Sequence, residues 1–171
     1  MLHITTARLH LVPCSLDVAR AAVVRRVELE RVLGASVPDD WPTRDLLDLL
    51  PFYADRLAAD PNWLGWGVWL MIHVPTQTLV GDLGFKGPPD EAGTVEIGYG
   101  VLPAFQRQGY ATEAVQSLVH WAFEQSNVQR IVAECLADNI PSIRVLERIG
   151  MQPLPPEGEM LRWELRQSAV D

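Results

Sequence analysis

The spacing of apolar positions changes several times along this chain, and each change marks a new element. Residues 7–13 alternate between apolar and polar side chains, which predicts a strand that ends at Pro13. Ser15 is a residue type that caps helices, and the apolar positions after it follow mostly helical spacing up to Gly34. The pattern therefore predicts one strand followed by one amphipathic helix.

A second amphipathic helix is predicted after a loop that contains two prolines. Thr43 caps this helix, and leucines recur along one of its faces. Pro51 lies in the middle of the pattern, and proline lacks the amide donor and clashes with the preceding helical turn. We therefore expect the helix to break or restart at Pro51 and to end near Ala59.

Three segments in the middle of the chain are rich in residue types that favour strands. They cover residues 65–73, 78–86 and 94–102, and the turns between them contain proline, glycine or aspartate. Consecutive strands joined by short turns pair antiparallel. An antiparallel meander is therefore predicted.

The last third of the chain returns to helical spacing and then alternates again. Residues 109–125 predict a long helix, and residues 130–135 predict a buried strand. A strand, a helix and a strand in this length form a crossover unit with parallel strands. Residues 141–150 predict another helix, 153–159 a turn and 161–165 a closing strand. The chain is thus expected to form one α+β domain, with a mixed sheet flanked by helices.

Composition excludes several classes of protein. With 171 residues, 48% of them hydrophobic, the chain has the apolar material for the core of a single domain and is unlike a disordered tail. Its longest apolar stretch, residues 64–72, is far shorter than the roughly 20 residues that cross a bilayer, and the N-terminus lacks a secretory pattern. Cys14 and Cys135 form neither a disulfide framework nor a metal cluster. We therefore expect a cytoplasmic protein with no metal and no membrane partner.

The charge balance argues against one class of binding partner, nucleic acid, but does not identify the actual partner. The formal net charge is −8, and no basic stripe occurs along the chain. Proteins that hold nucleic acid through its phosphates need such a stripe, so no nucleic-acid partner is expected. An acidic surface mildly favours a cationic partner such as an amine, but solubility is the simpler explanation of the charge.

The segment from Leu102 to Thr112 carries the most chemical information. A strand runs into a short polar loop, and an amphipathic helix begins at Gly109. The first turn of a helix exposes unpaired N–H groups with partial positive charge, and a glycine lets a phosphate approach them closely. Arg107 adds a charged donor for the same anion. The loop therefore predicts a pyrophosphate site, with an ordinary strand-to-helix turn as the alternative.

Two common phosphate-binding loops do not fit this segment. A Walker A loop needs Lys and Ser or Thr directly after its last glycine, whereas Tyr110 and Ala111 follow here. A dinucleotide fingerprint needs three glycines, and only Gly109 lies in the loop. ATP and NAD are therefore disfavoured as ligands.

Three motifs in order carry a resemblance to a known family. Gln106-Arg107-Gln108-Gly109-Tyr110-Ala111 resembles the pyrophosphate signature of the GNAT superfamily of N-acetyltransferases. Residues 95–101 resemble the strand before that loop, and residues 138–151 resemble the later N-x-x-S-x-x-x-L-E-K-x-G-F segment. The pattern is most similar to the branch of the ribosomal-protein N-terminal alanine acetyltransferases, strongly over residues 64–151. The resemblance implies a three-layer α/β/α fold with a central mixed, mostly antiparallel, splayed sheet, and acetyl-CoA as cosubstrate.

The resemblance also implies which residues hold the cofactor. The pantetheine arm is expected to fill the gap between the two splayed strands, and a backbone N–H near Val101 to polarise the thioester carbonyl. Asn139 is expected to bond the arm, although helix capping accounts for it as well. The implied cofactor-binding residues are Val101, Leu102, Gln106, Arg107, Gln108, Gly109, Tyr110, Ala111, Thr112, Asn139 and Ser142.

Two residues are candidates for proton transfer. Glu96 lies between Val95 and Ile97 and faces the opposite side of the strand, so it is the candidate general base. A solvated carboxylate or a structural ion pair is the alternative reading, and Glu134 is a weaker competitor. Many relatives use a tyrosine as the acid for the departing thiolate, but no tyrosine follows Tyr110 in this chain. Ser142, or a water that it holds, is the proposed substitute.

The sequence therefore predicts direct acetyl transfer from acetyl-CoA to a primary amine. The acceptor is either a protein N-terminus or a small-molecule amine, and a homodimer is possible by analogy with relatives. The alternative among enzymes is a different acyl donor of the same cofactor type. The missing tyrosine also leaves open a second class, a non-catalytic CoA-binding or interaction module with the same fold. A nucleotide-binding regulator ranks last, because it depends on the glycine turn alone.

Overall fold

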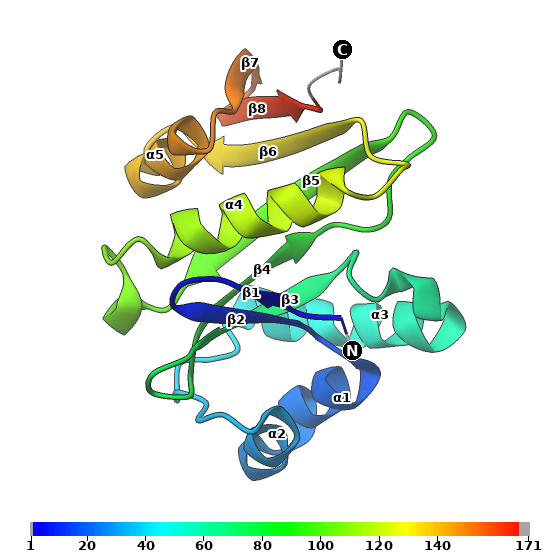
Figure 1. The fold of residues 1–171 in the computed structure, drawn as a ribbon, viewed down its shortest axis with the longest axis vertical. Coiled ribbons are helices and arrows are strands. Elements are labelled where there is room, and N and C mark those ends of the chain that lie inside the picture. Colours follow the sequence, from blue (N-terminus) through cyan, green and yellow to red (C-terminus); the bar gives the residue numbers. More distant parts are fainter. Residues whose placement is uncertain (1, 168–171) are drawn as a thin grey trace.

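The computed structural model describes residues 2–167, which form an eight-stranded mixed sheet with helices on both faces (Figure 1). The strands are β1 (Ile4–Thr5), β2 (Leu9–Pro13), β3 (Val68–His73), β4 (Thr78–Phe85), β5 (Thr94–Val101), β6 (Arg130–Leu136), β7 (Gln152–Glu157) and β8 (Met160–Arg166). The α-helices are α1 (Leu16–Val24), α2 (Arg26–Leu33), α3 (Arg44–Ala59), α4 (Tyr110–Phe123) and α5 (Ile140–Arg148). The strand order is β1-β2-β3-β4-β5-β6-β8-β7.

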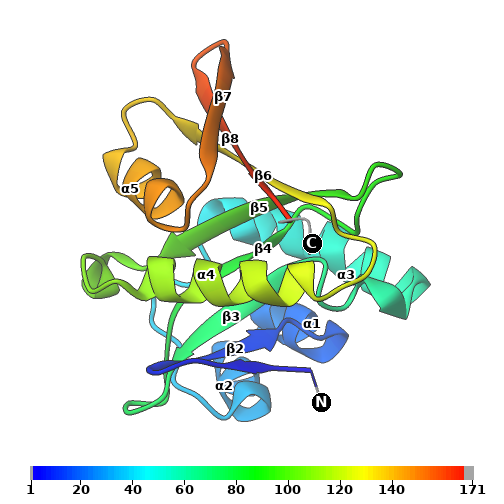
Figure 2. The same cartoon turned by 45° about the horizontal axis from the view of Figure 1, so that its top comes forward.

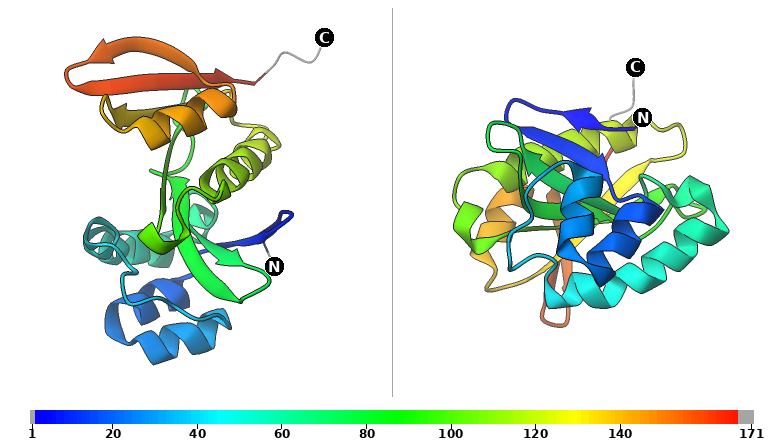
Figure 3. Two further views of the ribbon diagram at one scale, coloured as in Figure 1. Left: turned by 90° about the vertical axis from the view of Figure 1, so that its left-hand side faces the viewer. Right: turned by 90° about the horizontal axis from the view of Figure 1, so that it is seen from below.

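The helices divide between the two faces of the sheet and produce three layers. Figure 2 shows α4 running across the front of the sheet with α3 behind it, and the left view of Figure 3 shows the two helices on opposite sides. One core, which includes Leu9, Trp69 and Leu118, packs under α4. The other, which includes Leu50 and Leu70, packs under α1 and α3. The predicted α+β three-layer arrangement is confirmed.

The sheet splays in its middle, between β5 and β6. These strands pair in parallel only at Thr94–Glu96 of β5, so the edge of β5 that faces β6 has no strand partner from Ile97 to Val101. Helix α4 makes the crossover that joins the two strands. On its other edge, β5 continues the antiparallel meander with β4 and β3. Both the predicted meander and the predicted crossover are confirmed.

Two helix predictions are wrong. The single helix expected after Ser15 is interrupted at Arg25, whose extended backbone separates α1 from α2. The break expected at Pro51 does not occur, because α3 runs through the proline. Because proline has no N–H, the carbonyl of Leu47, one turn earlier, receives no helical hydrogen bond. Leu47 lies on the exposed face of the helix, where water can donate to this carbonyl instead.

The turn expected at residues 153–159 is also wrong. Residues 152–157 form β7, and the chain turns only at Gly158, whose φ of 65° is left-handed. This segment contains three prolines, which a central strand excludes because proline cannot donate to the ladder. Strand β7 lies at the edge of the sheet and pairs with β8 alone, so its prolines cost no sheet hydrogen bond on the open side.

Candidate active site

The loop between β5 and α4 presents unpaired backbone amides. Gly109 is the N-cap of α4 and has a φ of 83°, and Arg107 also has a positive φ, of 60°. The first helical hydrogen bond is donated by the N–H of Glu113 to the carbonyl of Gly109, over 3.1 Å. Within residues 2–167, nothing accepts from the N–H groups of Gly109 to Thr112. This end of α4 is therefore ready to bind an anion.

Arg8 ties this loop to the start of the chain. Its guanidinium donates to the carbonyl of Gln108 over 2.9 Å and to the carboxylate of Glu113 over 2.8 Å, and it lies 4.6 Å from the ring centre of Tyr110. The hydroxyl of Thr6 donates to the same carboxylate over 2.6 Å. Burial raises the pKa of Glu113, but the hydrogen bonds from Thr6 and Arg8 outweigh it and lower the pKa overall. The result is a fixed support beneath the first turn of α4.

Replacing Arg8 with alanine is expected to reduce the free energy of unfolding by about 1–3 kcal/mol, because it removes charge-assisted hydrogen bonds from a mostly buried carboxylate. The Glu113 pKa is lower in the folded state, so this stabilisation is complete above the ordinary value of 4.5 and is lost as the pH falls through the folded value. Urea unfolding of wild type and Arg8→Ala at pH 7 and pH 3.5 measures both effects.

Arg31→Ala provides the matched control for this prediction. Arg31 pairs with Glu28 on the exposed surface of α2, so its loss is expected to change stability far less. Equal destabilisation by the two variants at pH 7 would contradict a structural role for the support beneath α4.

A cleft of about 950 Å³ opens between this loop and α5, within the range of small-molecule sites. Three arginines line it: Arg107 from the loop, and Arg144 and Arg148 from α5. The cleft also borders the unpaired edge of β5, at Tyr99 to Val101. Unpaired amides and arginines suit phosphates, and an open strand edge suits an amide-bearing arm, so the residues fit coenzyme A.

Asn139, Ser142 and Tyr99 lie where α5 faces β5. The side chain of Asn139 accepts from the N–H of Ser142 over 3.2 Å and caps α5. The hydroxyl of Tyr99 reaches across the splay and donates to the carbonyl of Ser142 over 3.2 Å. Burial raises the pKa of Tyr99 to about 12, so its hydroxyl stays protonated at neutral pH. The hydroxyl of Ser142 has no partner within residues 2–167, and all three residues line the cleft.

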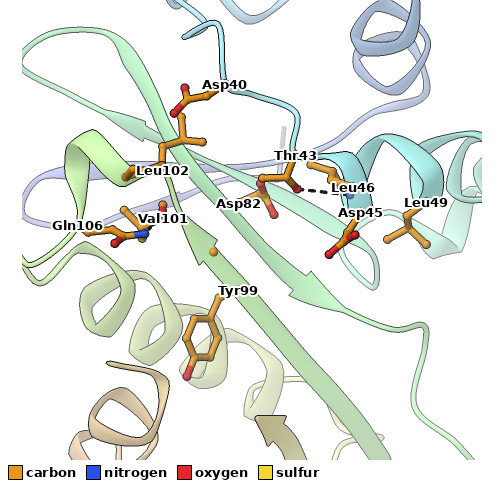
Figure 4. A pocket seen from close by; sticks show the side chains of 12 residues that line it. Asp40, Thr43, Asp45, Leu46, Leu49, Asp82, Tyr99, Val101, Leu102 and Gln106 are labelled. Atoms are coloured by element: carbon orange, nitrogen blue, oxygen red, sulfur yellow. Dashed lines mark hydrogen bonds between the residues drawn. The ribbon is translucent and has the colours of Figure 1, made fainter. Parts of the chain in front are cut away.

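A second cavity, of about 560 Å³, lies on the other side of β5. It meets the first at Tyr99, Gly100, Val101 and Gln106, which line both. Its other walls come from β4, the loop before α3 and α3 itself (Figure 4). Three carboxylates line it, those of Asp40, Asp45 and Asp82. The two cavities therefore have opposite charge and share one strand as their common wall.

Most of the predicted cofactor-binding residues lie together. Nine of them line the cleft: Val101, Gln106, Arg107, Gly109, Tyr110, Ala111, Thr112, Asn139 and Ser142. Leu102 lines only the second cavity, and Gln108 lines neither; the carbonyl of Gln108 accepts from Arg8 instead. The side chain of Gln106 donates to the carbonyl of Val101 over 2.9 Å, which fixes the loop to the end of β5.

Glu96, the candidate base, lines neither cavity. It lies four residues before Gly100 on the same face of β5, about 13 Å along the strand. Its carboxylate forms an ion pair with Lys86. Glu134, the weaker competitor, pairs with Arg162 over 3.6 Å. The catalytic role of Glu96 stays a prediction.

Sequence reasoning missed four residues that the fold brings to the site. Tyr99 and Asp82 line the cavities, Arg144 adds a positive charge to the cleft, and Arg8 supports the loop. For Arg144 a signal was present, because it lies one helical turn before Arg148 on the same predicted helix. Asp82 and Arg8 gave no local signal, since their positions depend on sheet register and on long-range packing.

Comparison with known proteins agrees with this geometry. The model of the acetyltransferase (GNAT) domain family matches residues 8–152. The uncharacterized N-acetyltransferase YjdG of Bacillus subtilis (strain 168) is 31% identical over 163 residues, which cover 95% of this chain and 97% of the relative.

Two solved structures share the fold at low sequence identity. The ribosomal-protein-S5-alanine acetyltransferase of Vibrio fischeri has a TM-score of 0.69 at 14% identity, over 100% of both chains. A ribosomal L7/L12 alpha-N-protein acetyltransferase in complex with coenzyme A has a TM-score of 0.70 at 17% identity, over 98% of this chain and 99% of that chain.

Among residues 2–167, no helix has the length and apolar character to cross a membrane. No group of three or more His, Cys, Asp or Glu side chains in the same range is placed to hold a metal ion. The cytoplasmic location stays a prediction.

The family model, the full-length relative and the paired cavities agree, and the chain belongs to the GNAT acetyltransferases, a family of acyltransferase enzymes.

Proposed function

We propose that this enzyme transfers an acetyl group from acetyl-CoA to a primary amine by direct transfer, with both substrates bound at once. The observation that carries the proposal is the pair of oppositely charged cavities that meet across Tyr99, Gly100 and Val101. A cationic cleft suits the phosphates of the donor, and an acidic cavity suits an ammonium group. Their junction brings the two reacting groups together without a covalent enzyme intermediate.

Different residues of the cleft bind different parts of acetyl-CoA. The amides at the start of α4 hold the pyrophosphate, and Arg107 and Arg144 add charged donors to the phosphates. The unpaired edge of β5 from Ile97 to Val101 pairs with the amides of the pantetheine arm, as an added strand would. Asn139 bonds the same arm near the sulfur. Acetyl-CoA supplies an activated acyl group at the Val101 end of this edge, where a backbone N–H polarises the carbonyl.

Ser142 is the proposed proton donor for the departing thiolate. Its hydroxyl has no partner within residues 2–167, and the residue lines the cleft that borders the end of β5. A free thiol has a pKa near 8.5, so a thiolate needs only a weak acid or a bound water. Glu96, the base predicted from the sequence, lines neither cavity, so it makes no direct contact with an acceptor bound there.

The acceptor is either a protein N-terminal amine or a small-molecule amine. Two structural neighbours are ribosomal-protein acetyltransferases, which favours a protein N-terminus. The cavity volume of about 560 Å³ favours a small molecule or the first residues of a peptide. The homodimer named in the sequence analysis stays a prediction.

Free-thiol release from acetyl-CoA, measured with a panel of amines, tests this function. The panel contains an N-terminal peptide, a polyamine, an aminoglycoside and an amino acid. We expect release with at least one of them. Tight binding of coenzyme A without release for any amine would favour the non-catalytic CoA-binding module instead.

Arg107→Ala is expected to weaken coenzyme A binding by about 10- to 100-fold, because a hydrogen bond between charged partners contributes about 1.5–3 kcal/mol. Isothermal titration calorimetry measures this change. Arg20→Ala is the control, because Arg20 is an exposed arginine of α1 that lines neither cavity. Equal weakening by both variants would show that overall charge, and not the loop, binds the phosphates.

A further inference from the structure

Asp82 is a carboxylate that neither the family motifs nor the sequence pattern singled out, yet it faces the junction of the two cavities. It lies on β4 directly opposite Gly100 of β5, as a Cα partner in the antiparallel ladder. Residues opposite one another in a ladder project to the same face of the sheet. Gly100 has no side chain, so nothing on β5 stands between Asp82 and the strand edge beyond it.

The surroundings of Asp82 fix its carboxylate without neutralising it. The indole N–H of Trp41 donates to one carboxylate oxygen over 2.8 Å. No lysine or arginine within residues 2–167 forms an ion pair with Asp82, Asp40 or Asp45. Figure 4 shows the carboxylates of Asp45 and Asp82 pointing into the space between α3 and β5. The second carboxylate oxygen of Asp82 is free to receive a proton from a ligand.

We propose that Asp82 is the catalytic base, which takes a proton from the ammonium group of the acceptor inside the second cavity. The inference rests on the proposed acetyl transfer to an amine. The acceptor enters as R–NH3⁺, and one N–H proton moves to the Asp82 carboxylate. The neutral nitrogen then forms a bond to the acetyl carbon while the carbon–sulfur bond breaks. A second proton leaves the nitrogen and reaches the thiolate through the hydroxyl of Ser142 or a bound water, and the proton on Asp82 returns to solvent.

The electrostatics of the cavity suit this role. Burial raises the pKa of Asp82 to about 6, and the hydrogen bond from Trp41 reduces this increase only in part. The other titratable groups around it are Asp40 and Asp45, which line the same cavity, and the buried thiol of Cys14, whereas the hydroxyl of Tyr99 points away from it toward Ser142. Burial and the charge of Asp82 raise the pKa of Cys14 to about 12, so this thiol stays neutral. A base that titrates near 6 is ionised at neutral pH and is better matched to an ammonium than an ordinary aspartate.

Asp82→Asn tests the proposal, because asparagine keeps the shape and the acceptor for Trp41 but cannot take the proton. We expect kcat/KM at pH 7.5, measured as thiol release with an accepted amine, to fall by about 100-fold or more. The wild-type profile of kcat/KM is expected to rise with pH through about 6, and the variant is expected to lack this rise. Asp82→Glu, which restores a carboxylate, is expected to recover part of the activity. It is also expected to recover the rise of kcat/KM with pH, which is called the acidic limb of the profile below.

Two further variants separate this role from simpler explanations. Asp45→Asn removes an equal charge from the same cavity and is expected to raise KM for the amine while keeping the acidic limb. Glu96→Gln removes the carboxylate that lies outside both cavities and is expected to keep the limb as well. Loss of the limb in Glu96→Gln, with retention in Asp82→Asn, would overturn the proposal in favour of Glu96.

Thermal unfolding shows whether Asp82→Asn is folded. The pKa of Asp82 is higher in the folded state than its ordinary value of 3.8, so its ionisation reduces stability as the pH rises through about 6. The variant is therefore expected to melt no lower than wild type at pH 8. Thiol release by wild type that Asp82→Asn leaves unchanged would overturn the role of Asp82 alone. No release by wild type with any amine would overturn the acetyl transfer and this role together.

Discussion

Gly100→Ala is expected to lower kcat by about 100-fold while leaving the protein at least as stable as wild type. Gly100 lines both cavities, and a methyl group built there meets no atom of the protein within 4 Å, so it projects into open space. That space is the path from the acceptor cavity to the strand edge, and a displacement of about 1 Å between reacting groups costs about 100-fold in rate. Steady-state kinetics with an accepted amine measures the loss.

Gly98→Ala is the matched control. Gly98 lies on the same face of β5, and a methyl group there also meets open space, but the residue lines neither cavity. Neither glycine has a positive φ, so alanine fits both backbones and is expected to add about 0.5–1 kcal/mol to the free energy of unfolding. A similar fall in kcat for both variants would mean that strand β5, and not the path over Gly100, limits the reaction.

The parts of the fold that could be predicted are those in which a local signal decides the structure. The left-handed glycine at 109 and the long amphipathic helix after it are set by neighbouring residues, and the crossover between β5 and β6 follows from their spacing. The three strands of the meander are joined by turns with their own chemistry. For these elements, propensity, periodicity and turn residues all favour the same outcome.

Two of the wrong predictions concern prolines at positions where exposure to water decides the structure. Pro51 is compatible with α3 because the carbonyl that loses its donor lies on the exposed face. The prolines of 152–157 are compatible with a strand because β7 is at the edge of the sheet. The sequence shows where each proline is, but not which side of the helix or strand faces water. The rule that proline breaks helices and strands therefore gives the wrong result at both places.

The site shows the same limit at longer range. Glu113 accepts from the backbone of Arg8 across 105 residues of sequence, and Asp82 faces Gly100 only because the antiparallel register places them opposite. A shift of one residue in that register would turn Asp82 to the other face of the sheet. The cofactor loop is contiguous and could be predicted, whereas the acceptor cavity is assembled from β4, β5, α3 and the loop before α3 and could not.

Gly109→Val is expected to weaken coenzyme A binding by about 100-fold, because the loop must hold its amides in one arrangement. Gly109 has a φ of 83°, a conformation in which a β-branched residue is strongly strained. The strain is relieved if the backbone moves, and this movement turns the N–H groups of residues 109–112 away from a common anion. Calorimetric titration of coenzyme A into the variant measures the loss.

Gly34→Val separates the loss of the anion site from general strain. Gly34 ends α2 with a φ of 66°, far from the cleft, and a methyl group there meets no atom within 4 Å. Both valines are expected to cost about 1–2 kcal/mol of stability, since both occupy the same left-handed region. Only Gly109→Val should reduce the affinity for coenzyme A. Equal affinities in the two variants would mean that the amides before α4 do not bind the pyrophosphate, and the phosphates would then depend on the arginines of the cleft alone.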